Sequence, residues 1–464
     1  MSITLSVGRR RRHLRPTMAV ALGFLGVIAA GTALLSAPWS SVDGSVTPLS
    51  DALFTATSAT CLTGLITVDT AAHWSAAGQV TVMALIQLGG LGFMTMASLL
   101  GLVVVGRLGL RQRLGATAEG RGIELGEVAW VVRATVLFTL VVEVLVATVL
   151  TLRFRSGYGY GWGRATWEGV FHAISGFNNA GFALYSDNVV GFAADAWVLL
   201  PLAFALMIGG LGFPVLLEGA RRVRARVENR PQRRWSLTSR YTLLGTAFLV
   251  PAGMAMVAFG EWNGALARAG GVDGAEPTTP VRLLNAFFAG VSPRTAGFNA
   301  VDYAHFHPST LMGTDILMFI GGGSGGTAGG VKITTAAVLI AAILAEVRGD
   351  DSVISHGRVV GRRVVRQSLA VLAAGLALVV GSTMALLFIA PQFSTDQLLF
   401  EVISAFATVG LSTGITGDLP VAAQMILIPL MFAGRVGPLA LATALAARSR
   451  GRLYDYPEER PFIG

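Results

Sequence analysis

Long apolar stretches recur along this 464-residue sequence, and they limit its possible folds more than any other feature. A helix needs about 20 mainly apolar residues to cross the hydrocarbon core of a membrane. Four stretches near that length cover residues 18–36, 135–152, 241–259 and 369–390. Because 53% of the residues are hydrophobic and only 13% are charged, a water-soluble fold would lack polar surface. We therefore predict an all-α integral membrane protein.

The basic residues predict the orientation of these helices. Lysine and arginine collect on the cytoplasmic side of membrane proteins. Of the 35 basic residues here, 27 lie in five clusters, and the segments that alternate with the clusters hold only six. The clusters lie within residues 9–15, 107–133, 221–240, 348–366 and 448–460. This alternation predicts eight transmembrane helices, with the N- and C-termini both in the cytoplasm.

Composition also argues against several classes of function. The single cysteine, Cys61, has no partner for an intrachain disulfide, and no cysteine and histidine spacing typical of a transition-metal site occurs. The formal charge of +9 would suit nucleic acid, but its placement beside the apolar stretches indicates membrane lipid as the neighbour instead. A cleaved signal peptide is a competing interpretation of residues 18–36, although that stretch exceeds the roughly 7–15 residues of a typical signal core.

A glycine-centred turn occurs four times in the segments predicted to lie outside. The central glycines, Gly64, Gly181, Gly297 and Gly410, are separated by 117, 116 and 113 residues, and such regular spacing indicates tandem repeats. Helix-start residues precede each turn, at Thr47, Thr166, Thr279 and Ser394. The intervening helices are too short to span, so we predict that each enters the membrane and returns through its turn. The repeats cover residues 1–119, 120–235, 236–347 and 348–464.

The chemistry of these turns is predicted to reside in the backbone. Rings of carbonyl oxygens can replace the water that potassium loses in a narrow pore, and glycine lets successive carbonyls turn inward. A single glycine of this kind is better explained as a residue that lets helices pack closely. Four of them at regular spacing instead favour a selectivity filter. The predicted ion-binding residues are Cys61, Leu62, Thr63, Gly64, Asn178, Asn179, Ala180, Gly181, Arg294, Thr295, Ala296, Gly297, Ala407, Thr408, Val409 and Gly410.

A glycine-rich segment interrupts the second apolar stretch of the third repeat. Each glycine inside a helix costs roughly 0.5–1 kcal/mol relative to alanine, so residues 321–330 are predicted to separate two helices as an intramembrane gating loop. The residues of this predicted gate are Gly321, Gly322, Gly323, Ser324, Gly325, Gly326, Thr327, Ala328, Gly329 and Gly330.

Three charged residues lie within apolar segments. A buried guanidinium needs acceptors, and the carbonyls of a broken helix supply them, so we predict that Arg435 binds the loop and holds it across the pore. Snorkelling of Arg435 to the membrane interface is the competing interpretation. Lys332 is assigned to the gate with the same two interpretations. Glu143 fits a proton relay or a partner inside the bundle equally well and receives no role.

Two motifs in the loop resemble enzyme signatures. Residues 322–326 fit the G-x-S-x-G pattern of hydrolases, and residues 325–332 approach a phosphate-binding loop. Neither follows a predicted strand, and both patterns need one to place their reactive groups. We therefore predict that the protein is not an enzyme.

Together, these residues resemble the Ktr/Trk/HKT superfamily of potassium transporters over essentially the whole chain. The resemblance lies in the four turns and in four further segments, which are residues 89–93 (GGLGF), 209–213 (GGLGF), 321–335 and 434–438 (GRVGP). The length and the ending at residues 456–464 are most similar to the bacterial Ktr membrane subunit. Cys61 and Leu62 depart from the family, whose first turn more often has threonine and valine there.

The resemblance implies a fold and a function beyond those derived from the residues. It implies four tandem helix/pore-loop/helix repeats around a pseudo-fourfold central pore in a bacterial plasma membrane. It implies potassium as the transported ion, since sodium transport in the family goes with serine at the position of Gly64, and it leaves Na+ open as an activating ion. It further implies a homodimer and a cytosolic nucleotide-binding regulatory ring. A cation-coupled secondary transporter of a small solute and a non-transporting membrane scaffold are the competing functions.

Overall fold

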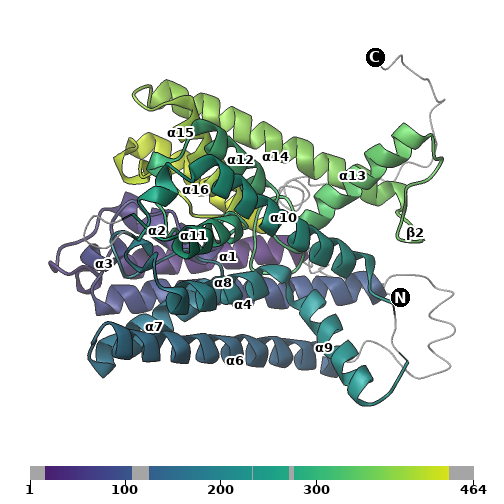
Figure 1. The fold of residues 1–464 in the computed structure, drawn as a ribbon, viewed down its shortest axis with the longest axis horizontal. Coiled ribbons are helices and arrows are strands. Elements are labelled where there is room, and N and C mark those ends of the chain that lie inside the picture. Colours follow the sequence, from purple (N-terminus) through teal and green to yellow (C-terminus); the bar gives the residue numbers. More distant parts are fainter. Residues whose placement is uncertain (1–15, 107–124, 232–233, 271–275, 438–464) are drawn as a thin grey trace, which may run out of the picture.

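The computed structural model describes residues 16–106, 125–231, 234–270 and 276–437. Within these ranges the chain is mostly helical (Figure 1). The basic clusters at residues 9–15 and 448–460, most of the cluster at 107–133 and the ending at 456–464 lie outside the described residues.

The helices follow one another along the chain, joined by turns and loops of varied length. Their bounds are α1 (Pro16–Leu35), α2 (Leu49–Cys61), α3 (Thr70–His73), α4 (Ala76–Gly106), α6 (Leu125–Gly157), α7 (Trp162–Phe177), α8 (Ala196–Leu211), α9 (Phe213–Val227), α10 (Leu237–Glu261), α11 (Thr279–Val291), α12 (Pro308–Phe319), α13 (Ile333–Arg348), α14 (Arg362–Ile389), α15 (Thr395–Ala407) and α16 (Val421–Val436). Two short antiparallel strands, β1 (Ile354–Ser355) and β2 (Arg358–Val359), form a hairpin between α13 and α14.

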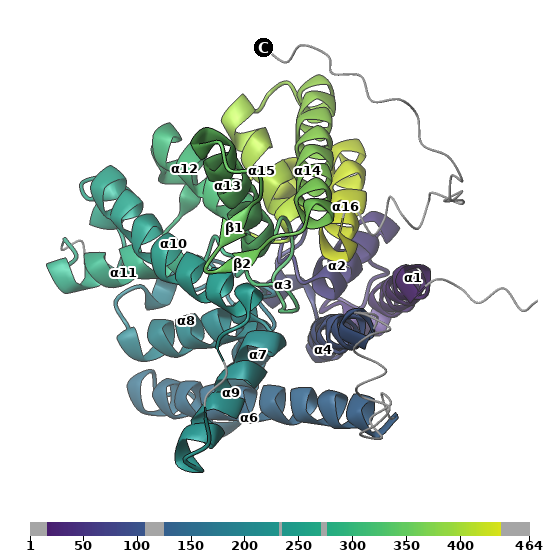
Figure 2. The ribbon, with the colours of Figure 1, turned by 90° about the vertical axis from the view of Figure 1, so that its right-hand side faces the viewer.

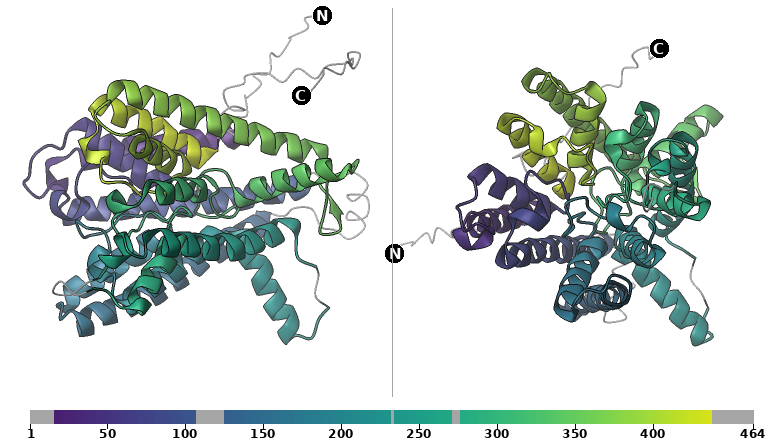
Figure 3. Two further views of the ribbon diagram at one scale, coloured as in Figure 1. Left: turned by 45° about the horizontal axis from the view of Figure 1, so that its top comes forward. Right: turned by 60° about the vertical axis from the view of Figure 1, so that its left-hand side comes forward.

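The helices close into a ring around a common centre. Each of the short helices α2, α7, α11 and α15 packs against the long helix that precedes it. Contacts also join neighbouring groups of helices, namely α4 with α7, α8 with α11, α12 with α15 and α16 with α2. The right-hand panel of Figure 3 shows the same order, with the chain colours running around the molecule until the yellow end lies beside the purple start.

Three helices of the described chain are long and apolar enough to cross a membrane, namely α6, α10 and α14. The pair α8 and α9 makes a fourth span if the two are counted together, although a bend of 97° separates them. The apolar stretches predicted from sequence lie within α1, α6, α10 and α14, apart from one residue beyond the end of α1 and one beyond the end of α14. The number eight stays a prediction.

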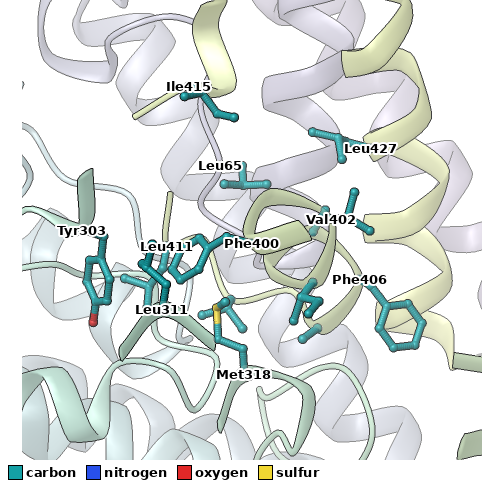
Figure 4. Packing of buried hydrophobic residues seen from close by; sticks show 14 of the residues in the cluster. Leu65, Tyr303, Leu311, Met318, Phe400, Val402, Phe406, Leu411, Ile415 and Leu427 are labelled. Carbon is teal, nitrogen blue, oxygen red and sulfur yellow. The ribbon is translucent and has the colours of Figure 1, made fainter. Parts of the chain in front are cut away.

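Apolar side chains fill the space behind the short helices. Figure 4 shows Phe400 and Phe406 of α15 beside Leu427 of α16, with Leu65 and Leu411 from the turns nearby. All five are buried and belong to one cluster. The turns are therefore fixed from behind by close packing, and burying a side chain of this size contributes roughly 1.5–3 kcal/mol.

The start of α7 differs from the sequence prediction. The helix begins at Trp162, four residues before the expected start at Thr166. Gly161 precedes it in an extended conformation, and its carbonyl oxygen accepts the first helical hydrogen bond from the Ala165 N–H at 2.9 Å. Glycine tolerates this N-cap position without a side-chain cap, which is why no serine, threonine or aspartate marks the start. The other three short helices begin close to the predicted residues.

Two helices are broken, and the sequence predicts only one of the breaks. Residues 320–332 separate α12 from α13, as the glycine content indicates. The second break, at Gly212 between α8 and α9, was not predicted, because the same GGLGF motif stays helical within α4. The two copies differ at the residue directly after the motif, which is Met94 in the first copy and Pro214 in the second. Proline lacks the N–H that would continue the helix. Gly212 itself has φ of +90°, which glycine alone adopts readily.

Candidate functional site

The four predicted turns share one backbone conformation. Two residues before each central glycine the backbone enters the left-handed region, which other residues rarely adopt. These residues are Leu62, Asn179, Thr295 and Thr408, with φ of 60°, 56°, 70° and 51°. The central glycines Gly64, Gly181, Gly297 and Gly410 have φ of 89°, 73°, 71° and 91°. Each turn is therefore built from the same pair of left-handed positions.

A serine in the last turns of each short helix holds the turn that follows it. Ser58 Oγ donates a hydrogen bond to the Leu65 carbonyl oxygen at 2.7 Å and accepts one from the Gly64 N–H at 3.0 Å. The backbone carbonyl of Ser58 accepts from the Thr63 N–H at 2.8 Å. In the other turns the bonds are a subset of these. Ser175 and Ser292 donate through Oγ to the Phe182 and Phe298 carbonyls, and Ser404 Oγ accepts from the Gly410 N–H at 3.0 Å. The backbone carbonyl of each of these serines also accepts an N–H from the turn. Sequence reasoning missed this group, although a serine five or six residues before each glycine is a visible signal.

The four central glycines approach one another without room for side chains. A Cβ atom added to Gly64 would lie 2.5 Å from the Ala180 carbonyl oxygen and 3.0 Å from the Cα of Gly181. One added to Gly181 would lie 2.9 Å from the Cα of Gly297, which in turn neighbours Gly410. One added to Gly410 would lie 2.9 Å from the Cα of Gly64, which closes the ring. The structure thus brings together the four positions that the spacing singled out.

Glycines from the following helices allow the short helices to approach closely. A Cβ at Gly89 of α4 would overlap the carbonyl oxygen of Thr60. Gly209 of α8 and Gly434 of α16 lie in the same way against the carbonyls of Phe177 and Phe406. Each of these carbonyls belongs to the residue four positions before a central glycine. The GGLGF and GRVGP motifs therefore support the ends of the short helices through backbone contact.

A cavity of about 400 Å³ opens on one side of the glycine ring. Its lining includes Gly64, Gly181 and Gly410 together with the exposed carboxylates Asp187 and Asp302. Two negative charges at the mouth of a cavity raise the local concentration of cations and disfavour anions.

Buried hydroxyl groups lie within the turns. The side-chain oxygens of Thr63, Thr295 and Thr408 are buried and make no hydrogen bond within the described part of the chain. An unpartnered hydroxyl in a dry interior is unfavourable unless it meets a ligand or water. Together with the backbone carbonyls they supply oxygen ligands of the kind that hard cations prefer.

The fourth turn is anchored by a buried carboxylate. Glu401 of α15 accepts hydrogen bonds from Ser412 Oγ at 2.5 Å, from the Thr413 N–H at 3.1 Å and from Thr416 Oγ1 at 2.7 Å. Ser412 and Thr416 in turn line the cavity. The carboxylate therefore fixes part of the mouth from behind.

The glycine-rich loop at residues 321–330 lies against the helix side of the turns. A Cβ at Gly330 would be 3.0 Å from the Cα of Ala407, and one at Gly329 would overlap the Thr408 hydroxyl. On its other side the loop bonds to the end of α8, where the Gly210 carbonyl accepts from the Gly323 N–H at 2.8 Å. The Gly209 carbonyl accepts from the Thr327 N–H at 3.2 Å in the same region.

Two cationic side chains, the buried Arg435 and the half-buried Lys332, hold carbonyl oxygens of this loop. Arg435 donates to the Thr327 carbonyl and, at 3.3 Å, to the Gly89 carbonyl. Lys332 donates through Nζ to the Ala328 carbonyl. Arg435 is 1% exposed, so it does not snorkel to the surface. The predicted contact between Arg435 and the loop is present, and its effect on ion flow stays a prediction.

The second turn carries a polar network of its own. Asn178 Nδ2 donates to Gln87 Oε1 at 2.8 Å and to Glu143 Oε1 at 3.1 Å, and Gln87 Nε2 donates to Glu143 Oε2 at 3.1 Å. Glu143 is thereby a partner inside the bundle, which was one of its two predicted interpretations. The network joins α4, α6 and the second turn.

The remaining predicted residues are placed in the same region. Arg294 of the third turn is buried and donates to Thr246 Oγ1 of α10 at 2.9 Å. Cys61 is buried at the last position of α2, directly before the left-handed Leu62. All four predicted groups of filter residues thus lie in or beside the turns, while ion binding itself stays a prediction.

Sequence comparison finds a protein family and individual proteins that are similar to this chain. A family profile described as "TrkH: Cation transport protein" matches residues 3–452. The chain is 36% identical over 453 residues to "Ktr system potassium uptake protein B" of Bacillus subtilis (strain 168), covering 97% of each chain. It is 34% identical over 470 residues to "Potassium/sodium uptake protein NtpJ" of Enterococcus hirae, covering 100% of each.

The fold is also similar to a solved structure. The crystal structure of the potassium transporter TrkH from Vibrio parahaemolyticus superposes with a TM-score of 0.73, covering 95% of this chain and 87% of that chain. The sequence identity of this pair is 18%, so the likeness concerns the fold.

The network around Glu143 is expected to stabilise the folded protein. Glu143→Leu removes the acceptor shared by Asn178 and Gln87. Asn178 keeps Gln87 Oε1 and the Ile174 carbonyl as acceptors, whereas Gln87 Nε2 loses its bond to Glu143, and each lost hydrogen bond costs about 0.5–1.5 kcal/mol. We expect a clearly lower thermal unfolding temperature for the purified variant in detergent, with Glu143→Gln intermediate. Val144→Ala, on the exposed face of the same helix, is the matched control. Equal unfolding temperatures for Glu143→Leu and the wild type would contradict this role.

Proposed function

Since this chain belongs to the TrkH family of cation transport proteins, we propose that it takes up potassium across the bacterial plasma membrane. Two relatives that match over nearly their whole length are potassium or potassium/sodium uptake proteins by name. The family consists of transporters, and the protein is accordingly not an enzyme. The observation that carries the proposal is the ring of four glycines, because it offers backbone oxygens at a point with no space for side chains.

The proposed selectivity filter is formed by the four turns. Potassium is held where rings of carbonyl oxygens replace its water, and the ring of central glycines supports such a pathway. Each turn follows the C-terminal end of a short helix, where the partial negative charge of the helix dipole favours a cation. The acidic cavity beside Gly64 serves as the outer entrance in this proposal.

The proposed architecture has eight transmembrane segments around a pseudo-fourfold pore. The segments are α1, α4, α6, α8, α10, the broken pair α12 and α13, α14 and α16, with both termini in the cytoplasm. The order of elements supports it, since each group places a long helix, a short helix and a further helix in sequence. This parallel order differs from the inverted repeats common in coupled secondary transporters.

The proposed gate is the loop at residues 321–330. It lies against Ala407 and Thr408, directly beside the fourth turn, and Arg435 and Lys332 hold its carbonyls. Several of its hydrogen bonds must break before the loop can move, and each contributes only about 0.5–1.5 kcal/mol. Such a loop can open without unfolding the surrounding helices.

Further parts of the proposal concern ions and partners. Sodium is proposed as an activating ion, and one relative carries both cations in its name. We also propose that the chain forms a homodimer and is regulated by a cytosolic nucleotide-binding ring, as its resemblance to the Ktr membrane subunit implies.

Replacement of Gly64 tests the filter. In a cell that lacks its own potassium uptake, the wild-type chain with its regulatory partner is expected to restore growth at low potassium. Gly64→Ser adds a Cβ where φ is 89°, and the strain of about 1–2 kcal/mol corresponds to roughly tenfold slower potassium uptake. We expect a relative gain of sodium over potassium. Gly23→Ala, where an added Cβ meets nothing within 4 Å, is the control. No potassium uptake by the wild type would refute the proposed function.

Neutralising Arg435 tests the gate. Arg435→Gln removes charged donors from the loop, and hydrogen bonds to charged groups contribute about 1.5–3 kcal/mol. We therefore expect about tenfold higher potassium flux at matched protein levels. Arg363→Gln, at an exposed position at the start of α14, is the control. Unchanged flux in a folded Arg435→Gln protein is the outcome that rules out this gate.

A further inference from the structure

Helix α9 leaves the bundle instead of continuing along it. The bend between α8 and α9 is 97°, so α9 runs roughly perpendicular to the segment that leads into it. Figures 1 and 2 show α9 projecting outward near the end of α6 that lies away from α3. The left-hand panel of Figure 3 shows the same projection from another side. If α8 crosses the membrane, α9 lies close to the membrane plane.

The residues of α9 divide into an apolar stripe and a basic surround. At 3.6 residues per turn, Leu216, Ala220, Val223 and Val227 fall on one face. Leu216 is half-buried, but Ala220 is exposed and Val223 and Val227 are 66% and 78% exposed, so no described part of the protein covers the outer part of this stripe. Arg224 and Arg226 flank the stripe on its two sides, about a quarter turn away. This arrangement is typical of helices that lie in a membrane interface.

Contacts on the opposite face fix how α9 is turned. Glu218 accepts hydrogen bonds from the Ser236 N–H at 2.8 Å and from Ser239 Oγ at 2.5 Å, both at the start of α10. The guanidinium of Arg222 lies over the ring of Trp235, 4.3 Å from its centroid. These contacts hold the polar face toward α10, and the apolar stripe is left facing outward.

We propose that α9 binds the cytoplasmic membrane surface through anionic phospholipid headgroups. The stripe enters the boundary between headgroups and acyl chains. Arg226 pairs with headgroup phosphates on one side, and on the other Arg224, whose Nε is bonded to Glu228 at 2.7 Å, presents its remaining guanidinium donors. Four arginines and two glutamates between residues 218 and 228 favour a negative surface over a neutral one. This inference rests on the proposed orientation, in which α9 lies on the cytoplasmic side.

Lipid binding at α9 would act close to the glycine-rich loop. The Phe213 N–H, at the first residue of α9, donates to the Gly325 carbonyl at 3.3 Å. A force that holds α9 against the membrane is thus transmitted to a backbone bond of the loop.

A fluorescent label on α9 tests the proposal in the full-length protein. The sole native cysteine, Cys61, is buried, so a label on Val223→Cys or on the control Arg221→Cys reports one position. Each labelled protein is placed in phosphatidylcholine vesicles with and without phosphatidylglycerol. Quenching by nitroxide lipid reports contact with the bilayer, and quenching by iodide reports contact with water.

We expect the label at residue 223 to be quenched by nitroxide lipid and shielded from iodide, with the reverse at residue 221. Phosphatidylglycerol should increase the lipid quenching at residue 223. Arg224→Gln with Arg226→Gln should abolish that increase, since each arginine near an anionic surface contributes about a fivefold preference.

Two outcomes would overturn the inference. One is free access of iodide to residue 223 in both kinds of vesicle. The other is shielding from iodide without nitroxide quenching, which would assign the stripe to a protein partner or a second copy of the chain. The label does not depend on ion transport, so lipid quenching in a protein that carries no potassium would refute the proposed function alone.

Discussion

The close approach of four glycine backbones is the constraint on which the rest of the structure depends. Side chains at Gly64, Gly181, Gly297 and Gly410 would collide with the neighbouring turns, so only backbone atoms can occupy this centre. Backbone at such a point needs its own support, because buried peptide groups must be bonded. The serines at the ends of the short helices supply that support in every turn, and glycines such as Gly89 let the following helices press against the helix ends.

The turns are alike at the centre and differ in what stands behind them. The second turn is tied to α4 and α6 through Asn178 and Glu143, and the fourth is tied to its own outer segment through Glu401. In the third turn Arg294 reaches Thr246 on α10. Four turns with the same backbone conformation therefore coexist with an asymmetric scaffold behind them.

The features that could be predicted from sequence are those that repeat at regular spacing or have an unusual composition. The four glycines are visible because their spacing repeats, and the break at residues 321–330 is visible because seven of its ten residues are glycine. The bend at Gly212 was missed because the same motif lies within an unbroken helix in α4, and only Pro214 distinguishes the two copies.

The left-handed backbone at Leu62 could not be predicted either. Leucine has no preference for this conformation, and packing around the turn imposes it. The partners of Glu143 come from positions 56 residues before and 35 residues after it, a separation that no local pattern reveals.

The unpredicted bend explains how the glycine-rich loop is held. Pro214 cannot donate the hydrogen bond that would engage the Gly210 carbonyl, and the N–H of Gly323 takes that place. On its other side the loop presents carbonyls to Arg435 and Lys332. The loop thus donates to carbonyls at the end of α8, while its own carbonyls accept from Phe213 of α9 and from the two cations. The break after α8 and the charge at Arg435 therefore both contribute to holding this one loop in place.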